Sequence, residues 1–291
     1  MKRTAILFYG LTNYLLGVAA LAYLVAFLFN LVVPKTIDSG AAGNGLAAAL
    51  VDLGLIALFG LQHSIMARRG FKAWLTRLVP SAAERSTYML ATALATFTLC
   101  LFWQPMPEVL WQADNPLLRQ ILLGVGLAGW GLVLVSSFLI NHFDLFGLRQ
   151  VWLHFVDREY TQLPFKAAGL YRYIRHPLMT GVFVGVWVAP TMTTGHLLFA
   201  LGMSAYILIG VYHEEKDLIR EFGEKYRQYI RATGRFLPAW STSTSRAGAR
   251  VPGDSPNTIS RTRVEPDVSK SRSERSRIQP ARLQSEKHPI R

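Results

Sequence analysis

Two short polar segments, one before and one after a long apolar stretch, carry the residue types best suited to chemistry. Their chemically useful members are Arg175, His176 and Pro177 in the first, and Glu214 and Glu215 in the second. Proline suits the first turn of a helix, and the free N–H groups and positive dipole end there favour a carboxylate or phosphate. The first segment is therefore suited to an anion and the second to a cation.

The apolar stretch between these segments, residues 176–213, contains no Asp, Glu, Lys or Arg. Gly195 is the midpoint between His176 and Glu214, so a hairpin turning at residues 193–196 would bring both ends to one membrane face. Each arm would hold about 18 residues, or roughly 27 Å at 1.5 Å per residue. A zwitterion would fit there, with its carboxylate toward Arg175 and its amine toward Glu214 or Glu215. Spacing alone is also compatible with topogenic basic residues and a solvated acidic helix end.

The composition places this hairpin in a membrane protein. The 291 residues are 51% apolar and 17% charged, whereas soluble domains average about 25% charged residues. A spanning helix needs roughly 20 apolar residues. Stretches of that length with no charge, or with Asp52 alone, occupy residues 4–34, 39–67, 86–107 and 120–143, in addition to the hairpin. We predict an all-α, polytopic membrane helical bundle with five or six transmembrane helices, six preferred, the last two forming the hairpin.

Lysine and arginine in the short loops predict the orientation. Residues 68–85 and 144–175 are rich in Lys and Arg, while the intervening loops offer only Lys35 and Arg119. Because basic loops stay inside, both termini are expected in the cytoplasm. The first apolar stretch follows Lys2 and Arg3, but it is about twice the length of a signal-peptide core, so we interpret it as an uncleaved anchor.

The C-terminal part of the chain differs from the rest. Residues 241–291 carry 11 Lys and Arg against 5 Asp and Glu and are rich in Ser, so we expect a disordered basic tail. The predicted organisation is transmembrane helices over 1–140, a cofactor-binding loop, hairpin and amphipathic helix over 141–240, then the tail. The amphipathic helix is expected over 214–231. The lone Cys100 excludes an internal disulfide and a four-thiolate zinc site, no metal site is expected, and no nucleic-acid motif is present.

The two polar segments match a known pattern. Gly-x-Tyr-x-x-x-Arg-His-Pro at 169–177, followed by Glu-Glu-x-x-Leu-x-x-x-Phe-Gly-x-x-Tyr at 214–226, resembles the membrane methyltransferases related to isoprenylcysteine carboxyl methyltransferase. The likeness covers roughly residues 140–231. The upstream runs Asn-His-Phe-Asp-Leu-Phe-Gly-Leu-Arg-Gln-Val-Trp at 141–152 and Tyr-Thr-x-Leu-Pro-Phe at 160–165 resemble, more narrowly, the bacterial methanethiol S-methyltransferases.

This resemblance implies S-adenosyl-L-methionine as cofactor, methanethiol as the small thiol substrate, dimethyl sulfide as product, and a bacterial inner membrane as location. The cofactor-binding residues that it and the charge pattern together indicate are Tyr171, Arg175, His176, Pro177, Leu178, Met179, Glu214 and Glu215. Two positions depart from the family. Met179 stands where an aromatic residue is common, and Gly210 stands where prenylcysteine enzymes carry an arginine for the substrate carboxylate. A carboxylate-bearing lipid substrate is therefore disfavoured.

Methyl transfer to sulfur requires a thiolate, and a simple thiol is mostly protonated near neutral pH. A positioned proton acceptor is thus expected. Candidates at the inner face are His142, Asp144, His154 and His213, of which His142, at the end of the fourth apolar stretch, is favoured as the catalytic residue. A histidine there is as often a helix-end donor to backbone.

Other functions stay open on the sequence alone. The same cofactor could serve a lipid or isoprenoid acceptor, or the chain could be a non-enzymatic membrane carrier or assembly protein. A carrier normally places several ionisable groups at mid-depth, and only Asp52 lies there. Asp52 and His63, three helical turns apart, could form a polar substrate path or bond to a neighbouring helix.

Overall fold

Long apolar helices make up most of the computed structural model, which describes residues 2–161, 163 and 167–239. The helices long and apolar enough to cross a membrane are α1 (Arg3–Leu28), α2 (Gly45–Ala67), α5 (Pro116–Ile140) and α9 (Thr194–Phe222). Two apolar helices are shorter, namely α4 (Glu84–Phe102) and α8 (Pro177–Trp187). The predicted all-α membrane bundle is confirmed, while the count of five or six spans stays a prediction.

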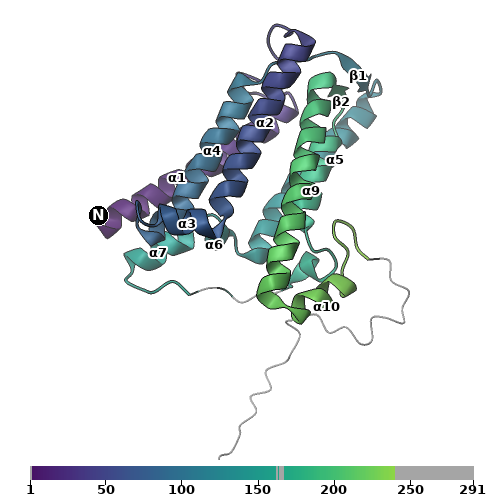
Figure 1. Cartoon of the computed structure of the whole chain (residues 1–291). Helices are drawn as coiled ribbons and strands as arrows, with labels where there is room; N and C mark the ends of the chain where they lie inside the picture. Colours follow the sequence, from purple (N-terminus) through teal and green to yellow (C-terminus); the bar gives the residue numbers. More distant parts are fainter. Residues whose placement is uncertain (1, 162, 164–166, 240–291) are drawn as a thin grey trace, which may run out of the picture. The chain divides into compact units, whose positions relative to one another are not determined.

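Short elements gather at one end of these helices (Figure 1). They are α3 (Arg69–Leu75), η1 (Ser81–Ala83), α6 (His142–Leu145), α7 (Leu148–Phe155), η2 (Gly169–Arg172) and α10 (Glu224–Ala232). At the opposite end, β1 (Val109–Gln112) pairs antiparallel with β2 (Thr191–Thr193). The predicted tail, 241–291, lies outside the described residues, and the boundary at 140 coincides with the end of α5.

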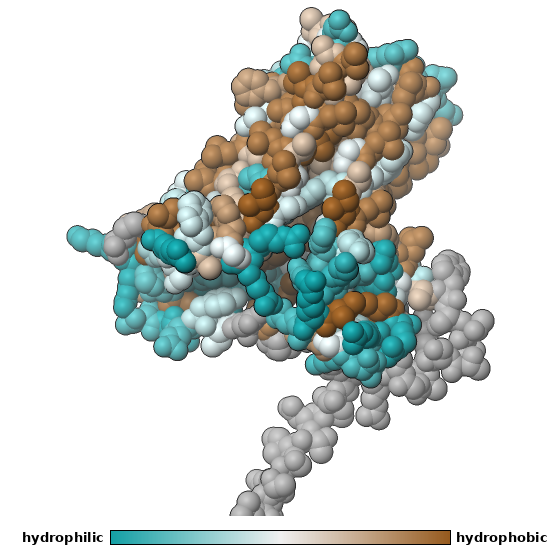
Figure 2. Space-filling view, viewed as in Figure 1, coloured by the Kyte–Doolittle hydropathy of each residue, from teal (hydrophilic) through white to brown (hydrophobic). Residues whose placement is uncertain are grey.

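The outer faces of the long helices are apolar. Phe8, Leu58 and Ile209 are 64%, 50% and 61% exposed. Figure 2 shows hydrophobic surface along the long helices and hydrophilic surface around the end that carries α3, α7 and α10. Such a surface is costly in water and suits hydrocarbon, where a helix is stable because its backbone hydrogen bonds are made within the helix. The protein is an integral membrane protein.

The interior is an aromatic cluster near the β1–β2 end. Phe27 of α1 and Phe199 of α9 meet the indole ring of Trp103, which follows α4, with centroid separations of 6.1 and 5.8 Å and edge-to-face geometry. All three side chains are fully buried. Such edge-to-face contacts add to the packing of the helices. The cluster therefore holds α1, α4 and α9 together away from the polar end.

The polar residues of α2 bond to the neighbouring helix. Asp52 is fully buried and its Oδ1 accepts the backbone N–H of Gln104, just past α4, at 2.8 Å. His63 contacts Thr92 of α4, with Nδ1 and Oγ1 3.4 Å apart, and its ring lies 5.0 Å from that of Tyr88. These contacts support the inter-helix interpretation of both residues rather than a substrate path.

The hairpin forms, but its turn and its arms differ from the expectation. The turn precedes residue 193, since α9 begins at Thr194 and the Thr193 hydroxyl caps it by accepting the N–H of His196 at 3.2 Å. The first arm, α8, has only 11 residues and the second has 29. Extended chain rises about 3.3 Å per residue against 1.5 Å in a helix, so the non-helical residues 188–192 lengthen the shorter arm and include the turn.

The expected amphipathic helix over 214–231 is confirmed only in its second half, as α10. Residues 214–222 instead continue α9 beyond its apolar part, which ends at His213. Gly223, at φ +58°, breaks the helix there and lets the chain change direction. The buried side chains of Tyr226 and Tyr229 then pack against Ala167 and Tyr171, so this face contacts protein.

Glycines allow α5 and α8 to pack backbone to backbone. A Cβ added to Gly129 of α5 would lie 2.6 Å from the backbone nitrogen of Gly185 and 2.8 Å from the carbonyl oxygen of Gly181, both on α8. Small residues that let helix backbones approach closely are a common means of association in membranes. This packing positions the start of α8, and with it residues 175 and 176.

Gly129→Ala is expected to destabilise the protein by about 1–3 kcal/mol, because the new methyl group meets backbone that cannot move aside. The matched control is Gly131→Ala on the same helix, where an added Cβ has no atom within 4 Å among the described residues. Thermal unfolding of both variants in detergent measures the difference. Equal midpoints for the two variants would contradict this account of the contact.

Candidate functional site

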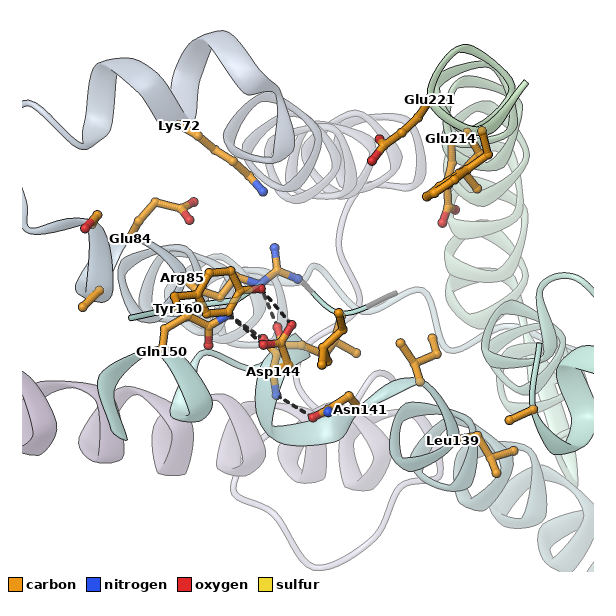
Figure 3. A pocket seen from close by; sticks show the side chains of 18 of the residues that line it. Lys72, Glu84, Arg85, Leu139, Asn141, Asp144, Gln150, Tyr160, Glu214 and Glu221 are labelled. Atoms are coloured by element: carbon orange, nitrogen blue, oxygen red, sulfur yellow. Dashed lines mark hydrogen bonds between the residues drawn. The ribbon is translucent and has the colours of Figure 1, made fainter. Parts of the chain in front are cut away.

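A cavity of about 1140 Å³ opens at the hydrophilic end of the helices. Its wall comes from α3, the start of α4, the end of α5, α6, α7, η2 and the polar end of α9 (Figure 3). Arg175, His176 and Glu214 all lie on this wall. The two polar segments that flank the hairpin are thus brought to one cavity, as the sequence predicts.

A buried ion pair joins the two segments. Nε of Arg175 donates to Oε1 of Glu215 at 2.8 Å, and both side chains are under 10% exposed. Nη1 of Arg175 donates to the carbonyl oxygens of Ile230, at 3.1 Å, and of Thr233. Nη2 of Arg235 donates to the second carboxylate oxygen of Glu215 at 2.8 Å. A buried pair with this many additional hydrogen bonds is well compensated for its desolvation.

Backbone hydrogen bonds hold the same region together. The N–H of Arg175 donates to the carbonyl of Gly234 at 2.8 Å, and the N–H of His176 donates to the carbonyl of Arg235 at 3.1 Å. The N–H of Gly234 returns a bond to the carbonyl of Tyr173 at 3.1 Å. The segment that follows α10 therefore clamps the segment that precedes α8.

The adjacent carboxylates on α9 have different surroundings. Successive helical residues are about 100° apart, so Glu215 points into the protein while Glu214 borders the cavity. The Glu214 side chain is 52% exposed, and its Oε2 lies 3.7 Å from Nδ1 of His176. Nε2 of His176 lies 3.2 Å from Oε1 of Glu215. Glu214 is thus the carboxylate of the pair that a ligand can reach.

Burial and neighbouring charges set the protonation states here. Burial holds the pKa of His176 below its ordinary value, although its hydrogen bond to Glu215 acts in the opposite direction. Burial alone would raise the pKa of Glu215, which lies on the polar end of α9, but hydrogen bonds and charges from Arg175 and Arg235 hold it below its ordinary value. His176 is therefore neutral and Glu215 ionised near pH 7.

Aromatic side chains form the wall beside Glu214. Phe222, Tyr226, Tyr229 and Tyr171 all line the cavity, and the hydroxyl of Tyr229 donates to the carbonyl of Tyr171 at 2.5 Å. Burial, and next the charge of Glu214, raise the pKa of Tyr171. Its ring is thus a neutral surface beside a carboxylate. The faces of aromatic rings attract cations, so these rings suit a cation held by Glu214.

The predicted cofactor-binding residues divide into two groups. Tyr171, Arg175, His176 and Glu214 line the cavity, with Glu215 directly behind Arg175. The first turn of α8 is different, since the described wall of the cavity does not include Pro177, Leu178 or Met179.

His142 lies off the described wall of the cavity. It is 4% exposed, its Nε2 is 2.9 Å from the hydroxyl of Tyr14 and its Nδ1 is 2.8 Å from the hydroxyl of Ser137. Its ring stacks on Phe138 with centroids 4.2 Å apart, and burial lowers its pKa. Both ring nitrogens therefore have protein partners, and its assignment as the base stays a prediction.

The other candidates for a proton acceptor are placed differently. Asp144 and His154 line the cavity, whereas His213 is exposed beside Tyr212. Asp144 accepts from Nη1 of Arg149 at 2.9 Å and from the hydroxyl of Tyr160 at 3.3 Å, a contact visible in Figure 3. Its carboxylate is thus already engaged within the wall.

Four residues in or beside the cavity are not indicated as site candidates by the sequence. Three of them line the cavity opposite Glu214, namely Lys72, Glu84 and Arg85 (Figure 3). In the sequence they belong to a basic segment whose composition indicates only membrane orientation. Arg235 binds Glu215 from 20 positions further along the chain. The only sequence signal for Arg235 is an isolated arginine after the amphipathic helix.

Exposed ion pairs cross the rim of the cavity. Arg69 of α3 binds Glu221 of α9, with Nη2 and Oε2 2.8 Å apart, and Arg68 lies 3.4 Å from Asp217. These bridges connect the α2–α3 corner to the polar end of α9. They hold the two walls of the opening together.

These features define a polytopic helical membrane protein with an open cavity at one end. Basic side chains lie on one wall of this cavity and Glu214 lies on the opposite wall. Curated relatives give the family. The chain is 45% identical over 238 residues to a methanethiol S-methyltransferase of Crocosphaera subtropica, covering 82% of this chain and 93% of that protein. It is also 45% identical over 238 residues to the enzyme of that name from Mycobacterium tuberculosis, covering 82% and 98%. The chain belongs to the methanethiol S-methyltransferase family.

A more distant similarity links the chain to Nurim of Sus scrofa, at 33% identity over 179 residues, 57% of this chain and 66% of that protein. No protein-family model matches the chain. No solved structure matches it either.

Glu215→Gln is expected to cost about 3–5 kcal/mol of stability, because it leaves Arg175 buried without its counter-charge. The matched control, Glu224→Gln, removes an exposed carboxylate that also contacts two arginines and should cost under about 1 kcal/mol. Thermal unfolding in detergent compares the two.

The cost of Glu215→Gln should also depend on pH. Because the folded state lowers the pKa of Glu215, its stabilisation is complete above the ordinary value of 4.5 and is lost as pH falls through the lower folded value. The gap between wild type and variant should therefore narrow in acid. A gap that widens in acid would contradict the assignment.

Proposed function

We propose that this protein is an S-adenosyl-L-methionine-dependent methyltransferase that converts methanethiol to dimethyl sulfide. The observation that carries the proposal is the 41–46% identity, over most of the chain, to enzymes named methanethiol S-methyltransferase. The cavity supports it, because it joins a reachable carboxylate, aromatic rings and basic groups in one space. An enzyme that binds a sulfonium amino acid needs those three features.

The residues on the cavity wall fit this methyl donor. We assign the donor's amino group to Glu214, the wall carboxylate that a ligand can reach. We assign its carboxylate to Nη2 of Arg175, which has no acceptor among the described residues. His176 borders the same space, with its one N–H directed at Glu215. Tyr171 and Phe222 suit the positive sulfonium, and the volume of about 1140 Å³ accommodates a nucleoside.

The donor supplies an electrophilic methyl group, and the protein supplies alignment and dry surroundings. Glu214 fixes one end of the donor, while the Arg175–Glu215 pair fixes the loop that bears Tyr171 and His176. The acceptor loses its proton and its sulfur forms a bond to the methyl carbon as the sulfonium bond breaks. Holding both partners in line is the main contribution of the chain.

We further propose that the cation-rich end bearing the cavity faces the cytoplasm of a bacterial inner membrane, with both termini on that side. The positive-inside tendency supports this, since Lys72, Arg85 and Arg158 all line the opening. A cytoplasmic opening would also give access to a water-soluble methyl donor.

Glu214→Gln is expected to weaken donor binding by about 10-fold or more, because a charge-assisted hydrogen bond contributes about 1.5–3 kcal/mol. Calorimetry with S-adenosylhomocysteine measures the affinity, and headspace analysis of dimethyl sulfide measures turnover. The control is Glu224→Gln, which lies off the described wall of the cavity. Unchanged affinity in Glu214→Gln would remove this residue from the site.

His142→Gln tests the proposed base. A residue that takes the thiol proton contributes about 100-fold or more to the rate, and its loss changes the pH profile. Ser137→Ala is the matched control, because it removes one hydrogen-bond partner of His142 but leaves the ring. A variant that loses thermal stability and keeps the wild-type pH profile would make His142 a structural residue.

A further inference from the structure

We propose that Lys72 and Arg85 form an anion site in the cavity that binds the acceptor sulfur as its thiolate. This proposal rests on the proposed function, since it concerns the second substrate of the same reaction. It assigns the lowering of the thiol pKa to two fixed positive charges, and the test of His142 asks separately whether a base takes the proton.

The two cations share one part of the cavity wall. Lys72 comes from α3 and Arg85 from the first turn of α4, and Figure 3 shows their nitrogen ends pointing into the open space. Arg85 is held in place, because its Nε donates to the carbonyl of Leu145 at 2.7 Å and its guanidinium carbon lies 4.9 Å from the ring centre of Tyr88. Its position is therefore set by the protein, while its terminal nitrogens face the cavity.

Neither cation is neutralised by a direct ion pair within the described part of the chain. No carboxylate there lies within 4.0 Å of Nζ of Lys72, and no acceptor contacts the terminal nitrogens of Arg85. The neighbouring arginines behave differently, since Arg69 and Arg149 each bind a carboxylate at 2.8–2.9 Å. Unpaired cations in a cavity are a ready receptor for an anion.

The other charged groups around the site do not cancel this charge. Glu84 is the acid whose charge acts on Lys72. Lys72 and Arg85 together therefore carry two positive charges beside one negative charge. Three other acids on the wall have partners: Asp144 binds Arg149, Glu221 binds Arg69, and Asp157 binds Arg3. Glu214 lies opposite, on α9, and is assigned to the donor's amino group. The other charged groups on the wall are Arg158 and Glu159, which offset one another.

Two further acceptors on this wall have no partner. One carboxylate oxygen of Glu84 and the amide oxygen of Gln150 are buried without a hydrogen bond among the described residues. Each could accept a hydrogen bond from the S–H group of an arriving thiol. The wall thus offers acceptors for the neutral thiol and cations for its conjugate base.

The electrostatics of Lys72 support an anion here. Burial lowers the pKa of Lys72, the charge of Arg85 lowers it further, and Glu84 raises it. A negative charge bound between the two cations would reverse the effect of Arg85. The same interaction lowers the pKa of a bound thiol, as basic neighbours do for reactive cysteines.

The site shares its cavity with the carboxylate that we assign to the donor. Arg69, one turn before Lys72, binds Glu221, and Glu221 lies two turns beyond Glu214 on the same face of α9, or roughly 10 Å. A donor anchored at Glu214 can extend toward the cations across that span. The thiol proton leaves to water through the open mouth, and the thiolate electron pair forms the new carbon–sulfur bond as the sulfonium bond breaks.

The test compares Lys72→Met with the control Lys225→Met, which removes an exposed lysine from α10. We measure kcat/KM for methanethiol between about pH 7 and about pH 10, and the affinity for S-adenosylhomocysteine. Lys72→Met should lose about 10- to 100-fold at neutral pH and recover at high pH, where thiolate forms unaided. Lys72→Arg should keep most of the activity, and donor affinity should stay unchanged in both.

Other outcomes would overturn the proposal in distinct ways. A pH-independent loss would assign Lys72 a positioning role, and weaker binding of S-adenosylhomocysteine would show that the cations hold the donor carboxylate. If wild type and Lys72→Met are equally active, the anion site is wrong and the proposed function stands. An inactive wild type with methanethiol defeats the proposed function first.

A measurement on the wild type does not depend on the folding of any variant. The pH at which its kcat/KM for methanethiol levels off should lie well below the solution pKa of that thiol. A profile that follows the solution pKa would overturn the anion site.

Discussion

The buried pair of Arg175 and Glu215 is the interaction on which the rest of the site depends. It links α9 to the segment before α8, and Arg235 and the carbonyls of Ile230 and Thr233 bring the end of α10 into the same network. Charge removed from water is stable only when it is paired and hydrogen-bonded, and both carboxylate oxygens of Glu215 and the Nε and Nη1 of Arg175 have partners here. Because Glu215 points inward, Glu214 is left to border the cavity.

The membrane part of the fold serves this arrangement by placing the two segments at the same end of the bundle. Close backbone contact between α5 and α8 fixes the short arm of the hairpin, and the capped start of α9 fixes the long one. The aromatic cluster around Trp103 anchors the far end. A rigid bundle thus supports a polar end built largely from loops and short helices, which is where binding residues usually lie.

Much of this could be predicted from the sequence. Gaps between charges indicate the apolar helices, and the flanking motifs indicate which residues meet. The position of the turn cannot be predicted by taking the midpoint of the hairpin, since that assumes two helical arms of equal length. One arm here is partly extended chain, which rises about twice as far per residue as a helix. The break at Gly223 was missed because the apolar spacing of Leu218, Phe222 and Tyr226 suits an unbroken helix. Contacts from Lys72, Arg85 and Arg235 depend on tertiary packing, and a basic loop has the same composition whether its side chains face water or a cavity.

The ion pairs of Arg68 and Arg69 across the opening have a consequence for how the protein responds to its surroundings. They are exposed to water, so dissolved ions weaken them over a screening length of about 8 Å at physiological ionic strength. Buried contacts deeper in the bundle are far less sensitive. Salt is therefore expected to weaken the contact between the α2–α3 corner and α9 before it affects the buried pair of Arg175 and Glu215.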